Sequence, residues 1–419
     1  MRALLLSGDV GESHAMMARA LSDQIRRDEP SASVWLANDF GVLGPRLGQL
    51  LGDGYRLHLE RVTWSYDLAY RLFGRVPVAQ RAGELALYGL GGPALAQVIA
   101  CHDPDVVVGV HPVINAVLGR LRAAGRLHCP VAAVVEPLGG LAFWVQPGAD
   151  MHLLNYEQAL RDVRARAGPD SVLVAVRPLV REEFHSPLPR ARARAELGID
   201  DERPLVAISG GGWGAGDLHG ATDACLALPG AHVIAVTGRN GALRAAIEAR
   251  HRTNPRVIAL GFTDRMRTLL SAADAFVTAT AGLSCLEARL CGCPTVCYPF
   301  EIGHIQDHVA QLQRHGLARA ATSPGQLTRE LLAALATGRD GVVAPRADLP
   351  DAGEALRALA NQSPGPRAAF AAEPIGRSTA TRPDRHPEPG GVVCLGHLRR
   401  RLGRGSPGGR NEMPSPESA

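Results

Sequence analysis

Short apolar runs rich in β-branched residues alternate along the chain with longer stretches whose apolar residues recur at helical spacing. This alternation is typical of βα units whose strands form a buried parallel sheet. In the first half, the predicted strands are residues 3–6, 34–36, 106–110, 131–135 and 172–176. In the second half they are residues 205–208, 233–236, 257–260, 275–277 and 295–298. The pattern therefore predicts an α/β protein with two parallel-sheet domains.

A segment with a different composition separates the two sets of strands. Pro187 and Pro189 precede an Arg/Ala-rich helical stretch, and we place the linker region at residues 184–203. The predicted domains are residues 1–183 and 204–361, with 352–360 as the last folded element. The remaining chain, 362–419, is rich in Pro, Gly, Arg and Ser and has too few apolar side chains to offset the entropy of ordering it. We predict that this tail is disordered.

Residues 40–100 interrupt the strand–helix pattern. They contain Trp64, Tyr66, Tyr70 and Phe73 and several Gly and Pro residues, without a clean strand. Two interpretations are open: the insertion is a lid that faces a substrate, or it is a set of extra helices over the edge of the sheet.

Charge and cysteine content narrow the classes of function. The formal net charge is only +4 over 419 residues, and the basic side chains are all arginine, nearly balanced by Asp and Glu, so no nucleic-acid partner is expected. The cysteines lie mostly in apolar runs without paired metal spacing, which suits a reducing compartment. Cys291, Cys293 and Cys297 are read as small apolar residues, and no metal site is predicted. No apolar stretch reaches about 18 residues, so no membrane-spanning helix is expected, and we predict a cytoplasmic protein.

Two glycine loops follow predicted strands and open helices. The first, residues 8–14, ends in His14, which would face a cleft because ligands of open parallel sheets bind beyond the carboxyl ends of the strands. The alternative is that His14 is an exposed first-turn histidine. The second loop contains Gly210, Gly211, Gly212 and Gly214, and its backbone amides would suit a diphosphate; a plain turn is the alternative.

A third segment, residues 281–288, places Ser284 and Glu287 on a largely apolar helix after the strand 275–277. A carboxylate in such a setting needs a partner, and the two hydroxyls of a ribose would serve. The alternative is that Glu287 is simply exposed at the surface.

Taken together, these motifs resemble the glycosyltransferase family that contains monogalactosyldiacylglycerol synthases, processive diacylglycerol glucosyltransferases and the N-acetylglucosaminyl transferase of lipid II. The resemblance runs from about residue 3 to 360. It includes the glycine loop ending in His14, the segment 104–112 ending in Val-His-Pro, and Glu136 eight residues before Trp144, where the family has an Asp. It implies the GT-B fold, in which two Rossmann-like domains face a central cleft.

In the second domain the resemblance assigns roles to individual positions. Gly210 to Gly214 match the diphosphate loop, Arg239 lies in a Gly-Arg-Asn turn, and Phe262 lies in the segment that holds uracil. Glu287 matches the ribose-binding Glu. Gln306 and Asp307 match a pair that contacts the donor sugar.

The implied reaction is an inverting transfer of a hexose from a UDP-sugar to a lipid acceptor such as diacylglycerol, without a metal ion or other cofactor. Either Glu136 or His14 would be the base, and the alternative for Glu136 is a structural pairing with a nearby Arg. Residues 40–75 would form a peripheral membrane face on the inner side of the plasma membrane. Three alternatives remain open: a non-lipid acceptor, epimerisation of a UDP-sugar, and nucleotide-sugar binding without catalysis.

Overall fold

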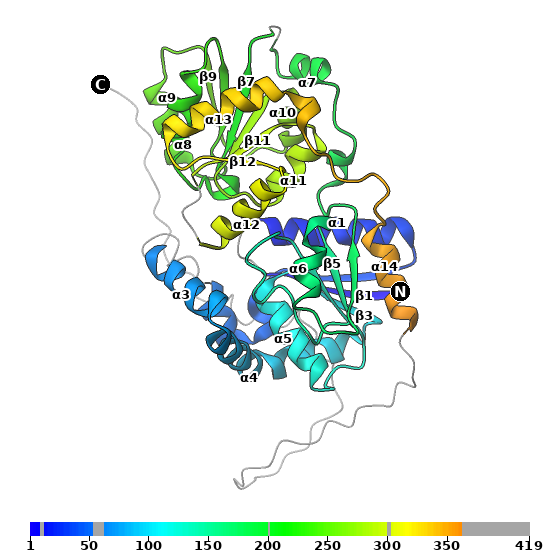
Figure 1. The fold of residues 1–419 in the computed structure, drawn as a ribbon. Coiled ribbons are helices and arrows are strands. Elements are labelled where there is room, and N and C mark those ends of the chain that lie inside the picture. The colour runs from blue at the N-terminus through cyan, green and yellow to red at the C-terminus, as the bar shows by residue number, and fades with distance from the viewer. Residues whose placement is uncertain (9–11, 53–62, 200–201, 300–302, 363–419) are drawn as a thin grey trace, which may run out of the picture. The chain divides into compact units, whose positions relative to one another are not determined.

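The computed structural model describes residues 1–8, 12–52, 63–199, 202–299 and 303–362. The predicted disordered tail therefore lies outside the described residues, except for Gln362, which ends the last helix. Within the described part the chain forms two parallel six-stranded sheets (Figure 1). The predicted fold class is confirmed.

The first sheet has the strand order β2-β1-β3-β4-β5-β6. Its strands are β1 (Arg2–Leu6), β2 (Ser33–Ala37), β3 (Val106–Gly109), β4 (Val131–Val135), β5 (Met151–Leu154) and β6 (Val172–Ala175). Successive residues point to opposite faces, so that Leu5 packs into one core while Leu4 and Leu6 pack into another. Because both faces are covered, the strands read as continuous apolar runs.

Helices and short 3-10 turns cover this sheet. They are α1 (Ser13–Asp28), η1 (Phe40–Leu43), α3 (Thr63–Arg75), α4 (Pro77–His102), α5 (Pro112–Ala123), η2 (Glu157–Ala159) and α6 (Leu160–Arg164). In the described part of residues 40–100, η1, α3 and α4 lie in this insertion. Both interpretations, a lid and extra helices over the edge of the sheet, are compatible with these helices.

Helix α4 differs from the expectation about membrane-spanning length. Of the helices in the described part of the chain, α4 is the one that is long enough and apolar enough to cross a membrane, judged by length and composition alone. Arg81 and Glu84 interrupt its apolar run. Leu95 and Ile99 of α4 are buried in the core of the first sheet, and the helix packs on α5 and η1. Its carboxyl half is therefore a core element of the first domain.

The second sheet has the strand order β12-β11-β10-β7-β8-β9. Its strands are β7 (Leu205–Ser209), β8 (His232–Val236), β9 (Val257–Leu260), β10 (Ala275–Thr278), β11 (Thr295–Cys297) and β12 (Arg319–Ala320). The helices are α8 (Leu218–Leu226), α9 (Gly241–Arg250), α10 (Met266–Ala272), α11 (Leu283–Leu290), α12 (Gly303–Arg314) and α13 (Pro324–Thr337), with short turns η4 (Gly211–Trp213) and η5 (Arg339–Gly341).

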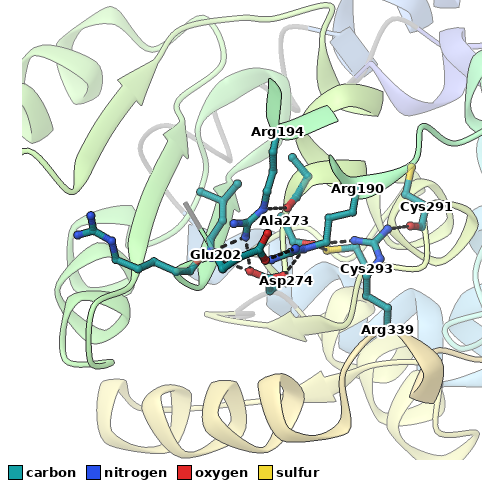
Figure 2. Close-up of polar contacts among 11 residues, drawn as sticks. Arg190, Arg194, Glu202, Ala273, Asp274, Cys291, Cys293 and Arg339 are labelled. Atoms are coloured by element: carbon teal, nitrogen blue, oxygen red, sulfur yellow. Dashed lines mark hydrogen bonds and ion pairs between the residues drawn. The ribbon is translucent and has the colours of Figure 1, made fainter. Parts of the chain in front are cut away.

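The predicted linker folds onto the second sheet through a partly buried acidic residue. It contains the end of η3 (Glu182–His185) and all of α7 (Arg190–Glu196). Figure 2 shows Arg190 and Arg194 of α7 converging on Asp274, with nitrogen–oxygen distances of 2.8 and 2.6 Å. The same carboxylate accepts a hydrogen bond from the backbone amide of Leu205 at the start of β7. Asp274 thus fixes the linker helix to the first strand of the second sheet.

The last helix, α14 (Ala352–Gln362), packs on α1 of the first half (Figure 1). Leu356 is fully buried in the contact, and the backbone amide of Ala352 donates to Gln24 Oε1 at 3.1 Å. Arg177, which follows β6, donates its backbone amide to the carbonyl of Pro350. The chain therefore passes between the two sheets twice, once through the linker and once before α14.

Candidate functional site

Glu136 follows β4 directly and is 9% exposed. Its Oε1 atom has no hydrogen-bond partner within the described part of the chain. Burial raises the pKa of this carboxyl to about 7. Among the described residues no arginine donates a hydrogen bond to Oε1, so the alternative pairing of Glu136 with a nearby Arg gains no support there. A carboxyl with a pKa near neutrality can both accept and release a proton.

Histidines lie on the segments next to this carboxyl: His14 follows Ser13, and His308 contacts Leu138. The ring of His14, in the first turn of α1, lies 4.6 Å from the ring of His111 and 5.6 Å from that of Trp144. Burial lowers the pKa of His14 to about 4, so its imidazole is neutral at physiological pH. The expectation that His14 faces the interior of a site rather than solvent agrees with its half-buried position.

His304 and His308 enter the same region from α12, one helical turn apart. His308 Nδ1 accepts a hydrogen bond of 2.9 Å from the backbone amide of Leu138, two residues after Glu136. Burial lowers the pKa of each histidine to about 4. Sequence reasoning missed both residues; their spacing of four on one helix, directly after the Pro-Phe turn that follows β11, is the signal that could have found them.

The loop before α11 meets Glu136 from the other sheet. A Cβ atom at Gly282 would lie 3.9 Å from Glu136 Oε1 and 3.5 Å from Ser13 Oγ. Ala281, next to it, has a φ of +48°, an uncommon backbone conformation for a residue other than glycine. The segment that carries Glu287 thus starts beside the candidate base.

Glu287 lies on α11 and is 5% exposed. Its Oε1 atom has no hydrogen-bond partner among the residues that the structure describes, and burial raises the pKa of its carboxyl to about 7. The surface-exposed alternative is therefore wrong. Ser284, one turn earlier, has its hydroxyl 3.3 Å from that of Thr278 and so faces β10. A buried carboxylate without a partner is expected where a ligand supplies the donors.

The second glycine loop is shaped by close backbone approaches. Gly211 and Gly214 have φ values of +69° and +64°, and a Cβ at Gly214 would lie 2.5 Å from the carbonyl oxygen of Thr237. The backbone amide of Arg239 donates to the carbonyl of Gly212 at 2.8 Å. These glycines are required by the packing of the loop on the Gly-Arg-Asn turn. At the start of α8, Asp217 already accepts from the amide of Gly220, so the helix start behind the loop is capped.

Arg239 lies at the centre of this region. Its guanidinium is 4.5 Å from the ring of Phe262, which is 59% exposed, and it forms an ion pair with Glu12. A Cβ at Gly212 would lie 3.7 Å from Arg239 Nη1. The structure therefore brings the predicted diphosphate loop, Arg239 and Phe262 together.

Asp307, which was predicted to contact the donor sugar, is hydrogen-bonded to two side chains of α3. The Tyr70 hydroxyl donates to its Oδ2 and Arg75 to its Oδ1, both at 2.7 Å. Both carboxylate oxygens are thus held by α3, which lies in the insertion of residues 40–100. Gln306 also has a polar or ring contact of its own.

The described residues contain no group of three or more His, Cys, Asp or Glu side chains that could hold a metal ion. Cys291, Cys293 and Cys297 are buried and free.

Comparison with known proteins gives these contacts a context. Residues 223–337 match the family described as "Glycosyl transferases group 1". Processive diacylglycerol beta-glucosyltransferase of Bacillus pumilus is 21% identical over 322 residues, which are 76% of this chain and 82% of the relative. An N-acetylglucosamine transferase of Leifsonia xyli, named for a pyrophosphoryl-undecaprenol substrate, is 28% identical over 341 residues, 78% of this chain and 84% of the relative. MurG of Acinetobacter baumannii superposes with a TM-score of 0.54 at 15% identity, covering 86% of this chain and 99% of that one. The chain is a glycosyltransferase of the GT-B fold.

Monogalactosyldiacylglycerol synthase of spinach is also similar to this glycosyltransferase, at 25% identity over 361 residues. The match covers 78% of this chain and 65% of the spinach protein, so it spans just under two thirds of that relative. Arabidopsis thaliana UGT89C1, solved with UDP, shares the fold with a TM-score of 0.52 at 16% identity, covering 86% of this chain and 99% of that one. The predicted relationship to glycolipid synthases and lipid II transferases is confirmed.

Proposed function

We propose that this glycosyltransferase moves a hexose from a UDP-sugar to a hydroxyl group of a lipid, with inversion at the anomeric carbon. Diacylglycerol is the first acceptor to test. The observation that carries the proposal is the buried Glu136 carboxyl. Its Oε1 has no hydrogen-bond partner among the described residues and lies beside Gly282, in the loop that leads to Glu287 and next to Ser13. The names of the relatives, which refer to diacylglycerol and to pyrophosphoryl-undecaprenol, support a lipid-linked acceptor.

In this mechanism Glu136 takes the proton of the acceptor hydroxyl as its oxygen forms a bond to the anomeric carbon. The bond from that carbon to the diphosphate oxygen breaks, and UDP leaves with the electron pair. Arg239 and the backbone of the Gly210–Gly214 loop would stabilise the charge that develops on the diphosphate. Glu287 would accept hydrogen bonds from the two ribose hydroxyls. Chemistry of this kind needs no resident metal ion, because the loop and the arginine supply the electrostatic stabilisation.

The function is tested with isotope-labelled UDP-sugars incubated with the full chain and extracted membrane lipids. We expect the label to appear in a glycolipid. The anomeric proton coupling of the intact glycolipid should show the configuration opposite to that of the UDP-sugar. Label in a water-soluble product would favour a non-lipid acceptor, and a changed sugar still attached to UDP would favour an epimerase. Binding of UDP-sugars without any product would favour a non-catalytic binding protein. Each of these three results would contradict the proposal.

A lipid acceptor requires contact with a membrane, and we propose that α3 and the first half of α4 provide it. The exposed apolar side chains of this face are Leu68, Leu72, Phe73, Val76, Val78, Leu85 and Leu90. Its exposed charged side chains are Arg71, Arg75 and Arg81, whereas Glu84 is buried against Arg120. Apolar residues flanked by arginine suit an anionic membrane surface. The face extends beyond the predicted limit of residue 75, and Arg56 and Arg61, which the prediction included, lie outside the described residues.

Replacing Leu72 by Asp should weaken binding to vesicles that contain phosphatidylglycerol by roughly tenfold, because the burial of one leucine side chain stabilises by about 1.5–3 kcal/mol. Co-sedimentation with vesicles measures the change. Leu332→Asp is the matched control, since Leu332 is an equally exposed leucine on α13. Equal binding by both variants and the unmodified chain would place the membrane surface elsewhere.

A further inference from the structure

Helix α3 contacts the candidate active site through one face. Asp67 Oδ1 accepts a hydrogen bond of 2.9 Å from the backbone amide of Gly303, the first residue of α12. One turn along α3, the Tyr70 hydroxyl donates to Asp307 Oδ2 at 2.7 Å, and the ring of Tyr70 lies 5.9 Å from that of His304. The two side chains thus hold both the start and the second turn of α12.

The same face also contacts the loop that follows Glu136. A Cβ at Gly140, whose φ is +70°, would lie 2.8 Å from the Tyr70 hydroxyl, and a Cβ at Gly139 would lie 2.3 Å from the carbonyl oxygen of Asp307. The loop and α12 are therefore packed backbone to backbone beneath Tyr70. Because His308 accepts from the amide of Leu138, a shift of α12 would move the loop that begins at Glu136.

The opposite face of α3 carries exposed apolar side chains. Leu68 and Leu72 are four residues apart, so they share one side of the helix, and they are 58% and 45% exposed. Val76, directly after the helix, is 44% exposed. Asp67 and Tyr70, three residues apart, share the other side. One short helix therefore has a surface suited to lipid on one side and contacts to active-site elements on the other.

We infer that α3 is a positioning helix, in which Asp67 and Tyr70 hold α12 and the loop after Glu136 in the arrangement for transfer, and that docking of its apolar face on a lipid surface tightens this hold. The inference rests on the proposed function and extends it. Neither Asp67 nor Tyr70 touches a reacting atom. They act through His304, His308 and the Glu136 loop, so that the site is fully assembled only where the acceptor is present.

Three variants test the positioning role. Tyr70→Phe removes the hydroxyl alone, and Asp67→Ala removes the acceptor for the Gly303 amide, whereas Asp67→Asn keeps an acceptor oxygen. We expect kcat to fall roughly tenfold in Tyr70→Phe and Asp67→Ala, because small displacements of reacting groups are costly, and to stay near the unmodified value in Asp67→Asn. The Kd for UDP should change less than about twofold in all three, since α3 holds groups for transfer rather than the nucleotide. Tyr88→Phe, on the neighbouring helix α4, is the matched control for loss of a hydroxyl.

Hydrogen exchange of the backbone amides of residues 303–308 gives a readout that does not depend on activity. Asp67→Ala should raise exchange there by about tenfold, since it removes one charge-assisted hydrogen bond. Phosphatidylglycerol vesicles should slow this exchange in the unmodified chain and in Tyr88→Phe, but not in Asp67→Ala or Tyr70→Phe. Unchanged exchange in Asp67→Ala, or no response of the unmodified chain to vesicles, would overturn the inference. A variant with altered exchange but the same kcat as the unmodified chain would also overturn the inference. Loss of transfer in every protein, with the exchange pattern as expected, would instead show that the proposed reaction is wrong.

Discussion

Glu136→Gln is expected to lower turnover by roughly 10²–10⁴-fold while leaving UDP affinity unchanged, because it keeps the shape of the side chain but removes the proton acceptor. In the unmodified enzyme, the rate should fall as pH decreases through about 7, where the Glu136 carboxyl becomes protonated. The Gln variant should lose this dependence. Steady-state kinetics across pH, with UDP binding measured by calorimetry, checks both expectations.

The control for this experiment is Glu84→Gln, which alters another buried carboxyl of the same half, paired with Arg120. A comparable loss of turnover in both variants would mean that Glu136 has no special role. If Glu136→Gln were fully active and His14→Ala were not, the base would be His14.

The raised pKa also predicts a gain in stability for the same variant. A buried carboxyl whose pKa in the folded state exceeds its value in the unfolded chain contributes stability below the unfolded value, and this contribution is lost as pH rises through about 7. Above pH 7, Glu136→Gln should therefore unfold at a higher temperature than the unmodified enzyme. Its free energy of unfolding should be larger by on the order of 3 kcal/mol at most, and the two proteins should differ little near pH 4. The candidate base would thus be retained at a cost in stability.

Glu287→Ala should weaken UDP binding by roughly 10- to 150-fold, which corresponds to about 1.5–3 kcal/mol for the loss of charge-assisted hydrogen bonds. Because burial raises the pKa of Glu287 to about 7, UDP affinity of the unmodified enzyme should also decline below that pH. Calorimetry with UDP alone measures both effects without an acceptor. Glu248→Ala, an exposed glutamate of α9 in the same half, is the control. Unmodified affinity in Glu287→Ala would remove the ribose assignment and most of the support for a UDP-sugar donor.

Local pattern was enough to predict most of the strands. The ten predicted strands all exist, since each is a short run of mostly apolar residues. Seven of them are almost fully buried, whereas the edge strands β2, β6 and β9 are only partly buried. β5 was missed because it begins Met-His; His152 is buried there through a contact with Ser171, which the sequence does not reveal. β12 was missed because two residues carry no periodicity.

Some features of the candidate site could likewise be predicted from local sequence pattern, and others could not. The buried settings of Glu136 and Glu287, though not their roles, could be predicted because one directly follows an apolar strand and the other lies on a largely apolar helix. The contacts of Asp307 could not, because Tyr70 and Arg75 are more than 230 positions away and approach it only through packing of α3 on α12. The capping of α8 by Asp217 is a local contact that was overlooked. An Asp that accepts a hydrogen bond from the backbone amide three residues later is a common N-cap pattern.

The return of α14 to α1 determines where the gene can be shortened. Ile25 of α1 is 1% exposed and Leu356 of α14 is fully buried, so that the two helices form part of a single apolar core. A fragment ending at residue 183 would carry all six strands of the first sheet and yet leave this side of α1 uncovered in water. A second-domain fragment that retained residues 352–362 would in turn carry an amphipathic helix without its partner. Separate production of either half therefore calls for the 352–362 segment to be joined to the first, by circular permutation or by supplying it as a peptide.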